Sequence, residues 1–254
     1  MARRGLHWGD WLFAALMLAL AGLCVFLGTW QVHRLAEKEA LIAAVDARLD
    51  AAPIAVPPAR DWPGLDLDNV NFQPVALTGS YRYDQTITVF TSLAGARGQY
   101  SGPGYWVVTP FVLRDGGTVF VNRGFVPQDM QEQAAMTGLP EGAETEITIK
   151  GLLRAAEHAG WFAPEADMSS RIEWVRDPER LARMVDPALT PFAPFYVDLP
   201  ADAPGQLPQG GETVVSFPNN HFGYALTWYG FAIVALVMLV FWLWRQARRG
   251  PPKG

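Results

Sequence analysis

One histidine stands where an imidazole could bind a metal at a membrane surface. His221 lies in the segment Asn219–Ala225, NNHFGYA, which leads directly into a long apolar block. Aromatic residues follow it closely, namely Phe222, Tyr224 and Trp228. An imidazole within an apolar, aromatic rim is suited to binding haem iron. The alternative reading is that His221 and its two preceding asparagines cap a helix and solvate its end.

A second group of polar and aromatic residues lies at the end of an earlier apolar block. The segment Gly28–Arg34 reads GTWQVHR, in which Trp30 and Gln31 are adjacent. If the two apolar blocks are helices packed antiparallel, this segment lies close to His221. His33 is then a further candidate ligand. The alternative reading treats Trp30 and Gln31 as anchors at the membrane–water interface.

The chain offers few other catalytic groups. Its only thiol, Cys24, lies inside the first apolar block, which excludes an intrachain disulfide and a cysteine-based zinc site. No GxSxG or HExxH motif occurs, and the four histidines form no pair at i, i+4 spacing. The glycine-rich stretch Ala94–Gly104 lacks the GxxxxGK[ST] pattern of a phosphate-binding loop. The sequence therefore argues against hydrolase or metalloprotease chemistry.

An arginine also follows a hydrophobic, strand-like run. The segment Val121–Pro127 reads VNRGFVP, and Gly124 permits an irregular backbone directly after Arg123. The alternative, structural reading is that Arg123 pairs with a carboxylate of its own domain where the strand ends.

Two long apolar blocks must position these residues. Trp11–Trp30 and Gly223–Trp244 carry no charged side chain, and each is long enough to cross a hydrocarbon core as a helix. Aromatic residues flank both ends of the second block, as in the aromatic belts of membrane proteins. A cleaved signal peptide is the alternative for the first block, although a signal core is shorter. A buried helix of a soluble protein is the alternative for the second.

Basic residues near the chain ends predict the orientation of the two spans. Arg3 and Arg4 precede the first block. The basic residues that follow the second block are Arg245, Arg248, Arg249 and Lys253. Because basic segments stay in the cytoplasm, we expect cytoplasmic termini and an external domain of residues 31–222, periplasmic at the inner membrane of a bacterium. The net charge of −5, with no basic stripe, argues against a nucleic-acid partner.

The segment between the blocks has the pattern of β-structure. Alternating runs rich in β-branched and aromatic residues predict strands at Val75–Tyr83, Gln85–Thr91, Tyr105–Leu113, Thr118–Val126 and Thr145–Leu153, and short strands at Phe195–Leu199 and Thr213–Phe217. The sequence RDGG at Arg114–Gly117 predicts a hairpin. A helix is expected after Asp177, which can cap it, and should end near Pro187.

These elements define a fold class. Transmembrane helices at 11–30 and 223–244 flank an external, β-rich domain, which we expect to be an antiparallel barrel or sandwich with one or two short helices. The proline-rich stretch Ala51–Gly64 should be a linker or strap without regular structure.

Several separate segments together resemble the surfeit locus protein one family of cytochrome c oxidase assembly factors. In chain order, the matching segments are Leu27–Ile42, Trp106–Phe111, Val121–Pro127 and Asn219–Ala232. The arrangement of two spans around a large external domain matches as well. The resemblance therefore covers nearly the whole chain.

The resemblance implies a function. Members of the family promote the assembly of haem-copper oxidases where haem a enters subunit one, and bacterial members look like haem a binders. His221 matches the position of their histidine beside the second span, which makes it the expected ligand of the haem iron. Trp30 and Tyr224 would pack around the porphyrin, and Arg34 would pair with a propionate. Gln31 and Trp228 complete the expected haem a site.

This reading makes the chain a non-enzymatic chaperone that holds haem a transiently. Its implied partners are oxidase subunit one, other oxidase assembly factors, a haem a synthesis enzyme and membrane lipid. Two other readings stay open. One is a cofactor-free membrane adaptor for oxidase assembly. The other is a membrane-tethered periplasmic enzyme, which would need a convergent nucleophile or a redox centre.

Overall fold

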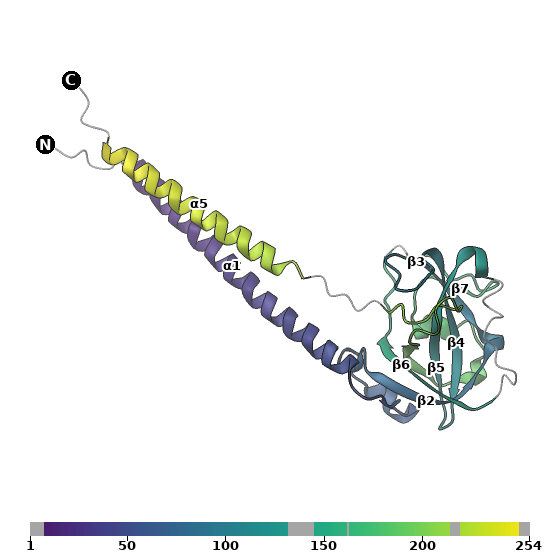
Figure 1. Cartoon of the computed structure of the whole chain (residues 1–254). Helices are drawn as coiled ribbons and strands as arrows, with labels where there is room; N and C mark the ends of the chain where they lie inside the picture. The colour runs from purple at the N-terminus through teal and green to yellow at the C-terminus, as the bar shows by residue number, and fades with distance from the viewer. Residues whose placement is uncertain (1–7, 132–144, 162, 214–218, 249–254) are drawn as a thin grey trace, which may run out of the picture. The chain divides into compact units, whose positions relative to one another are not determined.

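The computed structural model describes residues 8–131, 145–161, 163–213 and 219–248. The chain divides into two compact units. The helical unit comprises Met1–Ala44 together with Ser216–Gly254, and the β-rich unit comprises Val45–Val215. Figure 1 shows the long helices of the first unit and the curled sheet of the second.

Two long antiparallel helices make up the helical unit. Helix α1 runs from Trp8 to Leu49 and α5 from His221 to Arg248, and they lie side by side (Figure 1). The start of α1 contacts the end of α5, because Gln246 donates a hydrogen bond to Asp10 at 3.3 Å. Among the described helices, these two are long and apolar enough to cross a membrane.

Both helices extend beyond the predicted apolar blocks. The first apolar block ends at Trp30, but α1 continues without a break to Leu49. No Gly or Pro occurs between Trp30 and Pro53, and this stretch is rich in helix-favouring Ala, Leu, Glu and Arg. The end of the apolar run is therefore not the end of the helix.

Small side chains line the contact between the two helices. On α1, Ala21, Cys24 and Gly28 are buried at spacings of three and four. The buried alanines of α5 are Ala225, Ala232 and Ala235. A Cβ added at Gly28 would lie 2.9 Å from the ring of Tyr229, so the backbone of α1 approaches α5 closely there. Small residues permit this approach, as in helix pairs within membranes.

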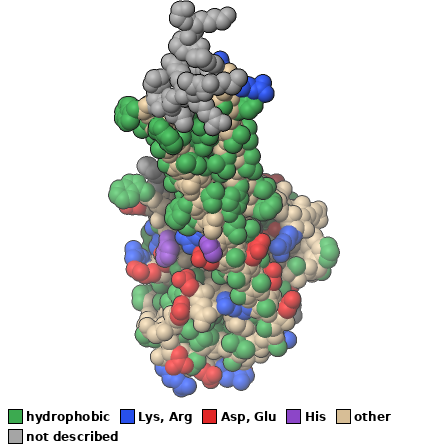
Figure 2. Space-filling view, turned by 90° about the vertical axis from the view of Figure 1, so that its left-hand side faces the viewer, with side chains coloured by type: hydrophobic (Ala, Val, Ile, Leu, Met, Phe, Trp, Pro, Cys, Tyr) green, Lys and Arg blue, Asp and Glu red, His purple; other side chains and the backbone are tan. Residues whose placement is uncertain are grey.

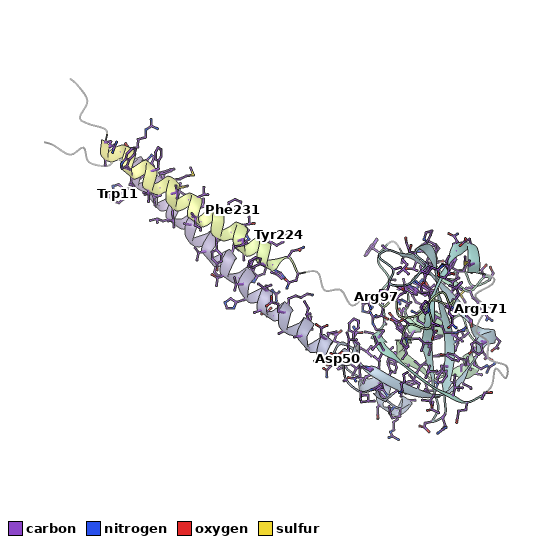
Figure 3. The ribbon with its side chains drawn as sticks, viewed as in Figure 1. Trp11, Asp50, Arg97, Arg171, Tyr224 and Phe231 are labelled. Carbon is purple, nitrogen blue, oxygen red and sulfur yellow. The ribbon has the colours of Figure 1, made fainter. Side chains whose placement is uncertain are left out.

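The outer surface of the helix pair is apolar. Figure 2 shows hydrophobic side chains covering the visible face of the helices. Trp11, Tyr224 and Phe231 stand out from this surface, and each is more than half exposed (Figure 3). Contiguous exposed apolar surface of this kind requires a lipid or protein partner.

The described residues of the β-rich unit form an eight-stranded sheet. The strands are β1 (Ile54–Ala55), β2 (Pro74–Tyr81), β3 (Ile87–Leu93), β4 (Gly102–Leu113), β5 (Thr118–Pro127), β6 (Ile147–Ala155), β7 (Ile172–Glu173) and β8 (Phe192–Asp198). The ring β2–β6–β8–β5–β4 closes on itself through pairing of β2 with β4, for example Tyr81 with Phe111. The unit is therefore a five-stranded barrel, with β3 paired to β4 and β7 paired to the far edge of β3.

The five long predicted strands and the hairpin at Arg114–Gly117 are confirmed, with ends shifted by up to three residues. The late strand at Phe195–Leu199 corresponds to β8. The prediction of a wholly antiparallel sheet is wrong, since β1–β2, β3–β7 and β5–β8 pair in parallel. The predicted strand Thr213–Phe217 lies outside the described residues except for Thr213, which is in no strand.

Side chains on the two faces of the barrel wall form separate cores. Inward residues recur at every second position, as in Val75, Leu77 and Tyr81 of β2, and pack with Phe111 and Phe195. The outer face of β4, β5 and β8 packs under a second apolar cluster. Short helical segments supply part of its cover: α4 (Pro178–Ala182) and the 3₁₀ turn η4 (Pro187–Leu189).

The helix predicted after Asp177 is confirmed, although it is shorter than expected. The Asp177 side chain accepts a hydrogen bond from the backbone N–H of Glu179, which caps α4. The other short helices among the described residues are α2 (Leu67–Val70) and the 3₁₀ turns η1 (Ala59–Gly64), η2 (Tyr83–Gln85) and η3 (Gln128–Met130).

The expected linker Ala51–Gly64 does contain regular structure, contrary to the prediction. It forms β1 and η1, and its Trp62 is buried in the barrel core, with the indole N–H donating to the carbonyl of Pro57. Prolines restrict the backbone but are compatible with a 3₁₀ turn and with an edge strand.

Candidate functional site

Gln31 and His221 meet across the helix pair. The Nδ1 atom of His221 lies 2.7 Å from the Oε1 atom of Gln31, although the two residues are 190 positions apart. Gln31 is buried and His221 is half-buried. The expected proximity of the two polar segments is thus observed for this pair.

Asn219, two positions before His221, performs the capping role that the alternative reading assigned to the whole segment. The Asn219 side chain accepts a hydrogen bond from the backbone N–H of His221 at 3.4 Å. The imidazole of His221 is therefore not engaged as a cap, and it is directed at Gln31 instead.

A close helix contact lies one turn away from this pair. Gly28 faces the ring of Tyr229, and the hydroxyl groups of Thr29 and Tyr229 are 3.1 Å apart. The sequence GTWQ therefore has a structural meaning. Gly28 allows close approach, Thr29 forms a hydrogen bond across the helix pair, and Gln31 reaches His221.

The other predicted haem-site residues lie on the same two helices. The Arg34 guanidinium lies 5.8 Å from the ring of Trp30 and pairs with Glu37 at 2.8 Å. Trp30 and Tyr224 are exposed, and Trp228 is half-buried with its ring 6.1 Å from that of Phe231. All of these rings except that of Phe231 were predicted as site residues.

His33 is exposed and lies two positions after the buried Gln31. Residues two apart on an α-helix do not share a face, so His33 points away from the Gln31–His221 contact. Among the described residues, no group of three or more His, Cys, Asp or Glu side chains could hold a metal ion together.

The β-rich unit contains a buried charge cluster that sequence reasoning missed. Asp198, at the end of β8, is almost fully buried and receives hydrogen bonds from Asn122 and Thr213, both at 2.8 Å. A nitrogen of Arg154 lies 3.1 Å from the same carboxylate, and a nitrogen of Arg176 lies 3.5 Å from it. We call these five residues the Asp198 cluster. No local pattern signals it, because its members come from five separate segments.

Arg176 connects this cluster to a second carboxylate. It forms an ion pair with Glu157, and its guanidinium lies 4.9 Å from the ring of Trp106. Burial disfavours the charged form of Arg176, but Asp198 and Glu157 together hold its pKa above its ordinary value. Burial also raises the pKa of the Tyr196 hydroxyl beside them.

The predicted irregularity at Gly124 is a β-bulge inside β5 rather than a strand end. Trp106 pairs with Phe125 and Val108 with Asn122, so β5 has one extra residue there. Gly124 has a φ of +138°, which L residues rarely adopt. The Arg123 side chain is buried and lies over the rings of Tyr83 at 5.0 Å and Tyr81 at 6.0 Å.

Side chains of the segment Gln209–Glu212 form hydrogen bonds with the backbone of the glycine-rich stretch Ala94–Gly104. The Glu212 carboxylate accepts hydrogen bonds from the backbone N–H groups of Arg97 and Gly98, and the Gln209 side chain bonds both polar groups of the Tyr100 backbone. Arg97 lies in this loop (Figure 3). The stretch is a clamped loop, which agrees with the absence of a phosphate-binding motif.

An open groove of about 970 Å³ lies next to this loop, within the β-rich unit. It is lined by the last turn of α1, the loop around Arg97, part of β6 and the segment 199–213. Both basic side chains, such as Lys150, and acidic ones, such as Asp202, line it.

Comparisons with known proteins find similar sequences over most of the chain. The SURF1 family model matches residues 18–233. A SURF1-like protein of Monosiga brevicollis is 31% identical over 248 residues, which cover 93% of this chain and 87% of that protein. Surfeit locus protein 1 of Mus musculus is 32% identical over 92% of this chain and 76% of its own, and that of Homo sapiens is 32% identical over 89% and 74%.

Proposed function

The chain belongs to the SURF1 family, and from this membership we propose that it is a cytochrome c oxidase assembly factor. In this proposal it binds haem a transiently near the outer membrane face and aids its insertion into oxidase subunit one. The observation that carries the proposal is the Gln31–His221 contact. It supports an oriented imidazole at the start of an apolar helix.

The donor set suits a haem. Histidine is a common axial ligand of haem iron, and its environment controls the chemistry at the metal. Around His221, the exposed rings of Phe222 and Tyr224 offer apolar surface to a porphyrin. Arg34 can pair with a propionate, since its exposed ion pair with Glu37 is worth only about 0.2–1 kcal/mol and exchanges readily.

A single histidine also fits the transient character of the complex. A chaperone must capture its cargo and then release it to a tighter site. One protein ligand at a half-buried position holds the iron less firmly than two ligands in a closed pocket. A single exchangeable ligand of this kind supports a carrier rather than an enzyme. Oxidase subunit one, other assembly factors and a haem a synthesis enzyme are the proposed partners.

We place α1 and α5 across the inner membrane of a bacterium, with both termini in the cytoplasm and the β-rich unit in the periplasm. The apolar outer surface of the helix pair supports membrane lipid as its surroundings. The basic residues at the chain ends support the orientation.

A haem a spectrum tests the proposal. The full chain is produced in a host that makes haem a, purified, and examined by absorption spectroscopy. We expect a haem a spectrum in the wild type that is lost in His221→Ala. His33→Ala is the matched control, since His33 is exposed on another face of α1, and it should keep the spectrum. A wild type that carries no haem a, or an equal loss in both variants, would refute His221 as the ligand.

The groove of the β-rich unit favours a second candidate, a cofactor-free adaptor that binds a segment of an oxidase protein. The same preparation distinguishes the two. A colourless protein that still restores oxidase activity in a deletion strain would favour the adaptor over the haem carrier.

A further inference from the structure

We propose that Gln31 is a positioning residue that holds His221 in the tautomer whose Nε2 atom is free to bind iron. The inference rests on the proposed function only for the identity of the metal group. That Nδ1 of His221 carries a proton follows from the contact between the two side chains.

The atoms of this contact determine where the proton lies. The partner of His221 Nδ1 is the Oε1 atom of Gln31, at 2.7 Å. An amide oxygen only accepts hydrogen bonds, so Nδ1 must be the donor. A neutral imidazole carries one ring proton, and Nε2 is then left with its lone pair. A metal ligand needs that lone pair.

The helix pair keeps the amide in place. Gln31 is 9% exposed, in the middle of α1, so its side chain has few alternative positions. The Gly28–Tyr229 contact and the Thr29–Tyr229 hydrogen bond set the separation of the helices nearby. The imidazole on α5 is therefore oriented by a residue on α1, and the ligand is preorganised only when the two helices are paired.

The chemistry of the acceptor determines how strongly the imidazole binds. When the imidazole N–H that does not face the metal donates a hydrogen bond, that bond fixes the ring orientation and raises the basicity of the nitrogen that binds the metal. A neutral amide does this more weakly than a carboxylate, because it carries no charge to stabilise the developing positive charge on the ring. Glutamine is thus suited to a histidine that must bind and later release its metal group.

The first measurement requires no haem. The full chain, with ¹⁵N-labelled histidine, is studied by NMR in detergent micelles at neutral pH, and His221 is assigned from its loss in His221→Ala. We expect the ¹⁵N shifts of a neutral ring protonated at Nδ1 in the wild type and a mixture of tautomers in Gln31→Leu. A wild-type ring protonated at Nε2 would overturn the proposal, whatever the outcome with haem.

The second measurement uses iron(III) protoporphyrin IX as the probe and follows the Soret band during titration of the full chain. Loss of the hydrogen-bond partner of a ligating histidine commonly lowers metal affinity about 10–100-fold. Gln31→Leu should therefore weaken binding by about that factor. Gln31→Glu should restore binding and lower the reduction potential of the bound iron. A purely structural role for Gln31 would not predict the change in potential.

Thr29→Val is the matched control. It removes the other hydrogen bond between the helices near this position but does not contact His221, so the affinity should stay within about twofold of the wild type. Equal weakening in Thr29→Val and Gln31→Leu would assign the effect to helix pairing and refute the positioning role. If the wild type binds no porphyrin at all, the proposed function fails, while the NMR result still decides the tautomer.

Discussion

Asp198 is a carboxylate that the fold cannot bury without its cationic neighbours. Its side chain is 3% exposed and is contacted by Arg154 and Arg176, which are themselves largely buried. Asp198→Asn keeps the shape but removes the charge, and it leaves two buried guanidinium groups short of a partner. Breaking a buried pair in this way costs about 3–5 kcal/mol.

We therefore expect Asp198→Asn to lower the midpoint of thermal unfolding of the β-rich unit strongly, at roughly 2–4 °C per kcal/mol. Circular dichroism of the full chain in detergent measures it. Asp61→Asn is the control, since Asp61 is exposed and its pair with Arg60 is long, at 3.7 Å. A shift for Asp198→Asn no larger than that of the control would contradict a structural role for the cluster.

Glu157 adds a pH dependence to the same region. Burial alone would raise its pKa, but the charge and hydrogen bonds of Arg176 outweigh burial and hold the pKa below the ordinary value of 4.5. At pH values between the folded and unfolded pKa, the unfolded chain binds more protons. The contribution of Glu157 to stability is therefore present above about pH 4.5 and is lost as the pH falls through the lowered pKa.

Removing this carboxyl group should make the thermal unfolding midpoint depend less steeply on pH in the acidic range. Glu157→Gln is expected to show a smaller loss of unfolding midpoint than the wild type between pH 5 and pH 3, read from thermal scans at each pH. The variant must be compared with the wild type at each pH, because other carboxylates with lowered pKa, such as Asp167, also titrate at low pH. Parallel pH curves for the two proteins would show that Glu157 is not stabilised by Arg176.

At the scale of elements, the bulge in β5 holds the strand against the Gln209–Glu212 segment. A Cβ at Gly124 would lie 2.4 Å from the carbonyl carbon of Gln209, and the φ of +138° is strained for an L residue. Gly124→Ala should thus combine a backbone strain of about 1–3 kcal/mol with a clash against main-chain atoms.

Gly116→Ala isolates the strain from the clash. Gly116, in the β4–β5 turn, has a φ of +93° but nothing within 4 Å of an added Cβ. We expect both variants to lower the thermal midpoint and Gly124→Ala to lower it distinctly more. Equal thermal midpoints for the two variants would mean that the main chain of Gln209 moves away from the added Cβ without loss of stability.

Sequence patterns predicted those elements whose cause is local. The alternation in β2, the turn at Arg114–Gly117 and the Asp177 cap each depend on neighbouring residues, and each is observed. Barrel closure is different, because the pairing of Tyr81 with Phe111 depends on strand curvature that no short window contains. The bounds of an apolar run do not give the length of α1, because its helix-favouring polar residues continue to Leu49.

The two candidate sites also differ in how far the sequence predicts them. The proximity of the segments that contain Gln31 and His221 followed from antiparallel packing of the two uncharged apolar blocks, so it could be foreseen across 190 residues. The Asp198 cluster could not be foreseen, since Asp198, Arg154 and Arg176 converge only after β6 and β8 have paired. One sequence holds many carboxylates, and it does not indicate which of them become buried.

At the scale of the whole molecule, charge at the chain ends should decide how the protein lies in a membrane. Arg3 and Arg4 precede α1, and Arg245 and Arg248 end α5. Two antiparallel spans place both ends on one side, and the positive-inside rule assigns that side to the cytoplasm. The hairpin turn at Asp115 should then lie outside.

Cysteine labelling tests this orientation, because the only native thiol, Cys24, is buried and serves as an internal negative control. In intact cells whose outer membrane has been made permeable, a membrane-impermeant maleimide should label Asp115→Cys and leave both Arg245→Cys and the wild type unlabelled. After lysis, Arg245→Cys should become reactive, since Arg245 is exposed at the end of α5. Labelling of Arg245→Cys but not Asp115→Cys before lysis would show that the topology is the reverse of the one proposed. It would move His221 to the cytoplasmic face and remove the basis for a haem site at the outer surface.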